Sequence, residues 1–142
     1  MLMFKQGRFW AEGASFAIPD GFFVETDPDV NYERGIGAWD PSCSVLYMWN
    51  VCEEDDGAKQ TLESVVKDYQ PLSKVTPIIL NGLSGYWGIY GGKTFQNYEV
   101  RFDLKNGWQI ALIVENSKYD IREVMESPEF KSALEGIRAE QT

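Results

Sequence analysis

Residues 97–116 read NYEVRFDLKNGWQIALIVEN, and this stretch decides the fold class. Apolar and polar residues alternate strictly over residues 97–104, which predicts a strand with one buried face. The opposite face is expected to lie in water and carries Asn97, Glu99, Arg101 and Asp103. Asn106-Gly107 then precedes an apolar run over residues 108–115, and because both residues tolerate positive φ, the pair predicts a hairpin.

The flanking sequence extends this hairpin into an antiparallel sheet. The run over residues 108–115 is apolar on one parity and partly apolar on the other, so we expect it near the sheet centre. Residues 75–80 and 83–90, separated by Asn81-Gly82, complete a four-stranded meander. Shorter strands are predicted in the first half of the chain, at residues 8–11, 15–18, 22–24, 36–40 and 44–51.

An amphipathic helix is predicted in the middle of the chain. Leu62, Val65, Val66 and Tyr69 lie at i, i+3, i+4 and i+7, and Pro71 ends the run. These apolar side chains form one stripe, so the helix is expected to pack on the sheet.

A second helix is predicted near the end of the chain. Ser127 is a favourable N-cap, Pro128 suits the first helical position, and Phe130, Leu134 and Ile137 form an apolar stripe. A short helical turn is expected before it, over residues 120–125. Because the chain has no internal repeat or linker, residues 1–142 are predicted to form a single α+β domain, with two main helices packed on the antiparallel sheet.

The net charge of the chain limits the classes of partner that we expect. The 142 residues carry 13 Lys and Arg against 22 Asp and Glu, a formal net charge of −9 at pH 7. Nucleic acid is therefore not an expected partner, because phosphate binding needs a basic patch. The acids concentrate in residues 1–71, which leaves two interpretations, a solvated surface or attraction of a basic partner.

Location and redox state are also expected from composition. No run approaches 18 consecutive apolar residues, so we expect no membrane insertion, and the first residues lack the pattern of a secretory signal, so we expect a cytoplasmic location. The two cysteines, Cys43 and Cys52, are nine residues apart. This separation predicts opposite faces of one strand, where both would stay reduced.

Several chemistries are excluded by residue type. The chain has no histidine, so Ser-His-Asp and Cys-His catalysis are impossible, and the usual Cys and His zinc site cannot form. Gly91-Gly92-Lys93-Thr94 resembles the end of a phosphate-binding loop, but Trp87 stands where that motif needs glycine, which favours a hairpin turn. We therefore predict no catalytic residue, no metal and no cofactor.

The acidic run Glu53-Glu54-Asp55-Asp56 precedes the first predicted helix. It is incomplete as a calcium loop, because Cys52 occupies the first ligand position and a strand comes before it. Two interpretations stay open. The acids could favour the positive end of the helix dipole, or they could contact a cation or a basic partner.

Aromatic residues are the most suggestive feature of the chain. The run over residues 44–51 is apolar on both parities, with Tyr47 and Trp49 on one side and Leu46 and Met48 on the other. We expect one face of the sheet to pack on the helices and the other to be covered by the first strands or by a partner. The run is therefore either a central core strand or part of an aromatic binding face that includes Trp87.

The order of these features resembles the PsbP-like family. The resemblance rests on residues 16–22 (FAIPDGF), the helix ending near Tyr69, the long meander and the closing helix from Ser127 to Ile137. It implies an α-β-α sandwich around an antiparallel sheet, and binding in place of catalysis. Members include subunits of the photosynthetic oxygen-evolving complex, a yeast nuclear-import factor that binds a small GTPase, and bacterial chaperones for secreted effectors. No catalytic or binding residue carries over.

We predict a non-catalytic protein-interaction module, such as an adaptor, chaperone or immunity-type protein. The expected partner is another protein that is basic or has an exposed apolar segment, and self-association is an option. The alternative is a small-molecule binding domain or a hydrolase that uses carboxylates. Trp49→Ala is expected to weaken partner capture and leave the fold intact. The candidate contact residues are Tyr47, Trp49, Trp87, Glu53, Glu54, Asp55 and Asp56.

Overall fold

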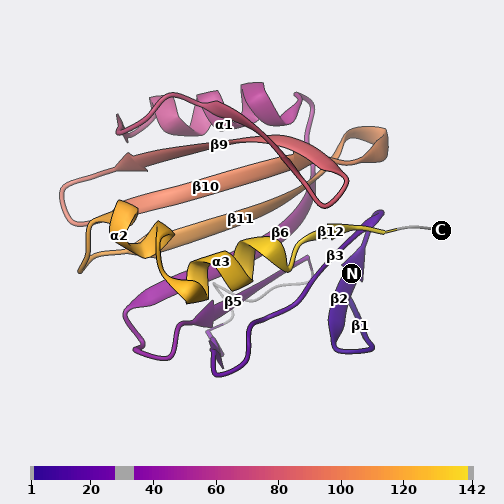
Figure 1. The fold of residues 1–142 in the computed structure, drawn as a ribbon. Helices are drawn as coiled ribbons and strands as arrows, with labels where there is room; N and C mark the ends of the chain where they lie inside the picture. Colours follow the sequence, from indigo (N-terminus) through magenta and orange to yellow (C-terminus); the bar gives the residue numbers. More distant parts are fainter. Residues whose placement is uncertain (1, 28–33, 141–142) are drawn as a thin grey trace.

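The structure, a computed structural model, describes residues 2–27 and 34–140 of the chain (Figure 1). The larger of its two antiparallel sheets contains β4 (Phe23–Val24), β5 (Gly35–Trp39), β6 (Val45–Glu53), β7 (Gln70–Pro71), β8 (Thr76–Leu80), β9 (Leu83–Gly91), β10 (Gln96–Asp103) and β11 (Trp108–Asn116). The smaller sheet contains β1 (Met3–Lys5), β2 (Arg8–Ala11), β3 (Ala14–Phe16) and β12 (Arg138–Ala139). The helical elements are α1 (Ala58–Lys67), the 3-10 turn η1 (Lys105–Gly107), α2 (Ile121–Met125) and α3 (Pro128–Glu135). The predicted α+β class with an antiparallel sheet is confirmed.

The predicted meander forms the middle of the larger sheet. β8, β9, β10 and β11 pair antiparallel in sequence order, and β6, β5 and β4 continue the sheet beyond β11. Asn81 and Asn106 both have positive φ, as do the glycines that follow them, so the two Asn-Gly turns are confirmed. A hairpin turn also joins β9 to β10, where the Gly92 N–H donates to the Phe95 carbonyl over 3.1 Å.

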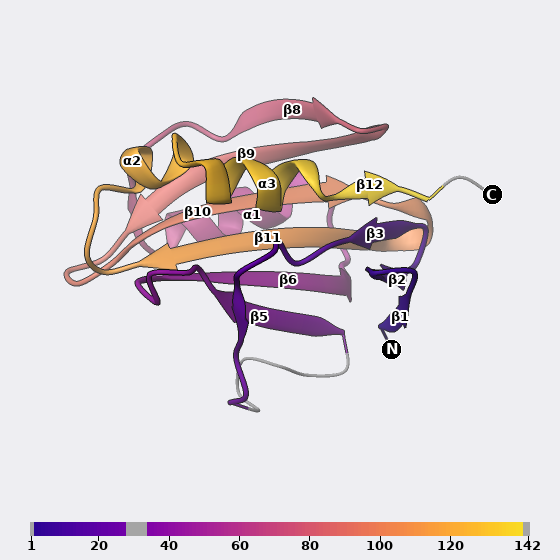
Figure 2. The ribbon, with the colours of Figure 1, turned by 60° about the horizontal axis from the view of Figure 1, so that its bottom comes forward.

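The two main helices lie on opposite faces of the larger sheet (Figures 1 and 2). α1 packs on β9 and β10 from one side. On the other side Phe130 of α3 meets Tyr98 edge-on, with 4.8 Å between ring centroids, and Phe16 of β3 stacks on Trp49 at 5.5 Å. The expectation that one face packs on both helices is therefore wrong, because Leu62 and Val66 of α1 pack with Tyr90 in a second apolar cluster, apart from the main core.

The cap predicted for α3 forms, whereas α1, for which no cap was predicted, begins differently. The Ser127 hydroxyl accepts the Phe130 N–H at 3.2 Å, as expected for an N-cap. α1 has no local side-chain cap, and its Ala58 N–H donates instead to Asp103 of β10, at 2.8 Å. α1 ends at Lys67, so Tyr69 lies beyond it. The first turn of α1 is thus held by a residue far away in sequence.

The main core lies between the larger sheet and the layer formed by α2, α3 and the smaller sheet. Trp49 is 0% exposed and Tyr47 is 1% exposed, and both point into this core. Trp87 is half-buried and stacks on Tyr98 at 5.7 Å. The interpretation as a central core strand therefore holds for β6, and the interpretation of Tyr47 and Trp49 as a binding face is wrong, because both side chains are buried in the core.

The cysteines also differ from expectation. Cys43 is exposed and has positive φ in the turn between β5 and β6, whereas Cys52 is part of β6. They do not share a strand, and both are free thiols. Within the described residues, no helix has the length and apolar character needed to cross a membrane.

The burial of Trp49 generates the first prediction. Trp49→Ala should lower the free energy of unfolding by about 3–5 kcal/mol, because it leaves a cavity in the main core. Chemical denaturation followed by circular dichroism measures this loss. Trp49→Phe, which keeps a ring against Phe16, should lose less, and equal stability of all three proteins would contradict the core assignment.

Candidate functional site

The face of β10 that was expected to be wet is buried beneath α1. Asn97 is 7%, Glu99 1% and Arg101 9% exposed, so the prediction of a solvated face is wrong for these three residues, whereas Asp103 is exposed as predicted. The reason lies on β9, where Gly88 pairs with Glu99. A Cβ at Gly88 would lie in ordinary van der Waals contact with Val66 of α1, at 3.6 Å, so α1 packs directly over this position of the sheet.

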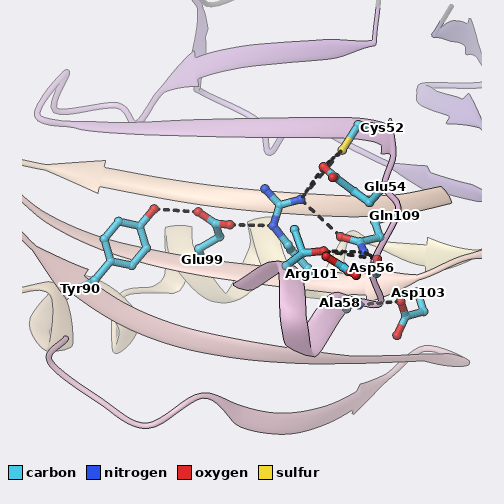
Figure 3. Close-up of polar contacts among 10 residues, drawn as sticks. Cys52, Glu54, Asp56, Ala58, Tyr90, Glu99, Arg101, Asp103 and Gln109 are labelled. Atoms are coloured by element: carbon cyan, nitrogen blue, oxygen red, sulfur yellow. Dashed lines mark hydrogen bonds and ion pairs between the residues drawn. The ribbon is translucent and has the colours of Figure 1, made fainter. Parts of the chain in front are cut away.

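Glu99 is the centre of a buried polar cluster (Figure 3). The Tyr90 hydroxyl donates to Glu99 Oε1 over 2.7 Å, and Arg101 Nε donates to Glu99 Oε2 over 2.7 Å. Both carboxylate oxygens therefore have a partner, which a buried carboxylate requires.

Arg101 extends this cluster across the sheet toward β6. Its Nη1 donates to Gln109 Oε1 at 3.3 Å and to Cys52 Sγ at 3.9 Å, and it lies 3.6 Å from Glu54 Oε1. Gln109 Nε2 in turn donates to the Asp56 carbonyl at 2.8 Å and to the Thr61 hydroxyl at 3.2 Å. The cluster thus links four strands to α1 and to the loop before it (Figure 3).

The protonation states fit this structural arrangement. Burial and then the Glu99 carboxylate raise the pKa of Tyr90. The phenol therefore stays protonated and donates a hydrogen bond to Glu99. Burial also raises the pKa of Cys52, so this thiol is not an activated nucleophile. Burial by itself lowers the pKa of Arg101, but attraction to Glu99 outweighs it and the pKa is raised. The cluster therefore holds α1 on the sheet and offers no activated group for catalysis.

The acidic run is spread over the end of β6 and the loop that follows. Glu54 is half-buried and lies beside Arg101, whereas Glu53, Asp55 and Asp56 are exposed. The structure brings Glu54 to the buried cluster but does not bring the run together with Tyr47, Trp49 or Trp87, which lie on the opposite face. Among the described residues, no group of three Cys, Asp or Glu side chains is placed to hold a metal ion.

Within residues 2–27 and 34–140, no helix lies over one part of the α1 face. α1 packs on β9 and β10, whereas β6 and β5 extend to one side of it (Figure 2). By strand register, five apolar side chains lie together on this part, and we call them the open strip: Phe23, Trp39, Leu46, Met48 and Ile113. Phe23 is 57% exposed; Trp39, Met48 and Ile113 are partly exposed, and Leu46 forms the floor.

Carboxylates border the open strip. The Trp39 indole N–H donates to Glu25, and this bond lowers the pKa of Glu25 and keeps it ionised. Glu115 is exposed and pairs by register with Leu46. Arg101 is the one basic residue at the described strand positions of this face, and it is already bonded to Glu99. The open strip is therefore apolar with an acidic border.

A separate cavity of about 410 Å³ lies on the other face, between the β5–β6 turn and the α2–α3 segment. Its lining includes Asp40, Tyr119, Glu123 and Glu129. Asp40 is already engaged, since its carboxylate accepts hydrogen bonds from the Ser42 hydroxyl and from two backbone N–H groups. The cavity has the size of a small-molecule site.

Sequence reasoning missed both the buried cluster and the open strip. Glu99 and Arg101 alternate with apolar residues in the way that a solvated face does. Gly88 was the available signal for close approach of a helix, together with the partly apolar second parity of β11. For the open strip, the alternation along β6 already placed Leu46 and Met48 on the face opposite Tyr47 and Trp49. Nothing in the sequence indicated that Trp39 would lie beside them.

Comparison with known proteins supports the fold alone. No model of a known protein family matches the chain, and no curated protein matches it. Among solved structures, it is similar to LpqN of Mycobacterium tuberculosis, a protein involved in cell envelope biogenesis. The TM-score is 0.56 at 12% identity, over 90% of this chain and 83% of LpqN.

A Bacteroides thetaiotaomicron protein is also similar, with a TM-score of 0.55 at 7% identity. The match covers 95% of this chain and 48% of the Bacteroides chain, so the present chain spans about half the length of that protein. These identities are too low to transfer a function.

The ion pair beneath α1 generates the second prediction. Arg101→Met should cost about 3–5 kcal/mol of unfolding free energy, because it leaves the Glu99 carboxylate buried without its cation. The double variant Glu99→Gln/Arg101→Met should recover most of this loss in urea denaturation. Glu54→Gln is the control and should change stability by less than about 1 kcal/mol, since this partly exposed pair is screened by water. Unchanged stability of Arg101→Met would show that the pair does not hold the fold.

The buried tyrosines generate the third prediction. Burial raises the pKa of Tyr90, Tyr98 and Tyr47 above the ordinary value of 10.0, so above that pH the unfolded chain loses phenolic protons that the folded chain retains. Stability should therefore be intact below pH 10 and fall as the pH rises further. Tyr90→Phe should make this slope shallower by up to about 1.4 kcal/mol per pH unit in denaturation series, with Tyr119→Phe as the control. If the unfolding free energy of Tyr90→Phe and of the original chain fell equally steeply above pH 10, the contribution assigned to Tyr90 would be contradicted.

Proposed function

We propose that this chain is a non-catalytic protein-binding module, of the adaptor, chaperone or immunity type, and that the open strip is its docking surface. The carrying observation is the contiguous apolar strip beside α1, which no described helix or strand covers. Its position replaces the earlier expectation that Tyr47 and Trp49 would meet the partner.

The composition of the open strip supports this proposal. Trp, Phe and Met are enriched at the centres of protein interfaces, because they bury a large area and adapt to a partner surface. The five side chains are neighbours by register across β4, β5, β6 and β11, so they form one patch. Scattered apolar residues on a protein surface would need no such explanation.

The buried cluster supports a role without catalysis. Glu99, Tyr90 and Gln109 are bonded to one another or to their neighbours, and α1 covers them. A general acid or base must contact the substrate and transfer a proton to or from it. These side chains instead lie beneath α1 and form hydrogen bonds within the protein. The carboxylate-dependent hydrolase therefore has less support than a binding module.

A small-molecule binding domain is the second candidate function. The cavity beside Tyr119 supports it, because its size of about 410 Å³ suits a small ligand and Glu123 and Glu129 would favour a cationic one. It ranks below protein binding because the open strip joins five apolar side chains, whereas the cavity lining includes the carboxylates of Asp40, Glu123 and Glu129.

The fold type and the location are also proposals. The placement of α1 and α3 on opposite faces of one antiparallel sheet supports a PsbP-like sandwich, and superposition on members of that family tests it. We propose a cytoplasmic location. Because LpqN is involved in cell envelope biogenesis, cell fractionation should compare cytoplasm with envelope.

Protein capture tests the docking surface and is the fourth prediction. Tagged chain should retain a stoichiometric partner from extracts of its native cell, and Met48→Gln should weaken that binding about tenfold, because an apolar anchor is lost from the interface centre. The matched control is Ile79→Gln in β8, where an isoleucine is 82% exposed on the same sheet face but on the other side of α1. Biolayer interferometry with the captured partner measures both variants.

Two outcomes would contradict the proposal. Equal binding by Met48→Gln and the original chain would remove the open strip as the docking surface. If no partner is retained and a metabolite raises the melting temperature, the small-molecule function takes its place.

A further inference from the structure

The open strip and its border define the chemistry of one partner. We propose that the strip binds a basic amphipathic helix of another protein, lying on β6 and β11 alongside α1. This inference rests on the proposed function, and it adds the kind of segment that is bound and the charge that selects it.

As far as the described residues show, the spacing of the strands leaves room for one more helix. α1 packs on β9 and β10, and neighbouring strands lie about 4.8 Å apart, so a helix above β11 and β6 would be about 10 Å from α1. This is the ordinary distance between packed helices, about 8–10 Å. The partner helix would therefore contact the open strip with one side and the flank of α1 with another.

The flank of α1 carries a matching hollow. A cavity of about 300 Å³ lies between α1 and the loop before it, and its lining includes Val65 of α1 and Asp68, which directly follows α1, together with Glu54, Asp56 and Arg101. Val65 continues the apolar surface toward α1, whereas Asp68 and Asp56 continue the acidic border. The proposed groove is thus apolar at its floor and acidic along its sides.

Charge selects a basic segment. Glu25 and Glu115 lie at one end of the groove, and Glu54, Asp56 and Asp68 lie along the α1 side. Arg101 is paired with both Glu99 and Glu54, so its one positive charge faces two carboxylates and leaves the groove with no surplus of positive charge. Lysine and arginine side chains on both flanks of a bound helix would bury their stems along the strip and place their charges against the carboxylates.

The same observations disfavour other occupants. A second copy of this chain would bring the carboxylates of two borders together, which costs binding energy. An added strand would need a long free edge, but β4, at the outer edge of this part of the sheet, is two residues long. A helix instead needs only apolar residues at i, i+3 or i+4 and i+7 on one face.

A peptide probe tests the proposal and is the fifth prediction. The probe is an amphipathic Leu–Lys peptide of about 18 residues, and its Leu–Glu counterpart is the charge control. Isothermal titration calorimetry should detect binding of the Leu–Lys peptide to the protein and no binding of the Leu–Glu peptide. Amide NMR shifts should be largest in β5, β6, β11 and the flank of α1.

Matched charge variants separate the groove from the net charge. Glu25→Lys/Glu115→Lys should weaken binding of the Leu–Lys peptide at least about tenfold, because it reverses the border of the strip. Glu126→Lys/Glu135→Lys changes the net charge equally at two exposed positions of the α2–α3 segment and should leave affinity within about twofold. Equal weakening by both variants, or binding of the Leu–Glu peptide as tightly as the Leu–Lys peptide, would overturn the proposal.

The inference can fail separately from the proposed function. If the native partner depends on Met48 but the Leu–Lys peptide does not shift the amides of the strip, the strip is a docking surface for a different kind of segment and the inference falls alone. If the native partner binds the Met48→Gln variant as tightly as the original chain, the open strip is not the docking surface, and both the proposed function of the strip and this inference are rejected.

Discussion

The ion pair between Glu99 and Arg101 is the constraint on which the rest of the structure depends. A carboxylate at the centre of a sheet face is tolerated only if its charge and both oxygens are satisfied, and Arg101 and Tyr90 meet this need. Arg101 then reaches Gln109, which bonds to the loop before α1 and to Thr61. The buried polar cluster therefore fixes the position of α1 on the sheet. That position in turn determines which part of this sheet face α1 leaves uncovered.

Local signals predicted most of the elements, because their causes lie within a few residues. The Asn-Gly turns at Asn81 and Asn106 and the Ser127 cap depend only on neighbouring backbone, and each formed as expected. The helix faces and the burial of Glu99 depend on contacts between distant strands. Alternation of polar and apolar residues cannot distinguish a solvated face from polar side chains buried beneath a helix, so alternation alone gave the wrong environment for Glu99.

The candidate site shows the same division. The acidic run around Glu54 was visible in the sequence, but the aromatic residues chosen beside it, Tyr47 and Trp49, lie in the core on the opposite face. Strand parity correctly separated Met48 from Trp49, yet parity does not say which face is covered. That choice is made by α1 and by the strands around Phe16, which pack from opposite sides.

The cap of α1 has a consequence for the stability of this helix. Asp103 accepts the Ala58 N–H across 45 positions of sequence, and the loop before α1 supplies no side chain for this role. The helix is ten residues long, which is short for a stable isolated helix in water. Its first turn is therefore completed only when β10 is in place, so the stability of α1 is tied to that of the β10–β11 hairpin.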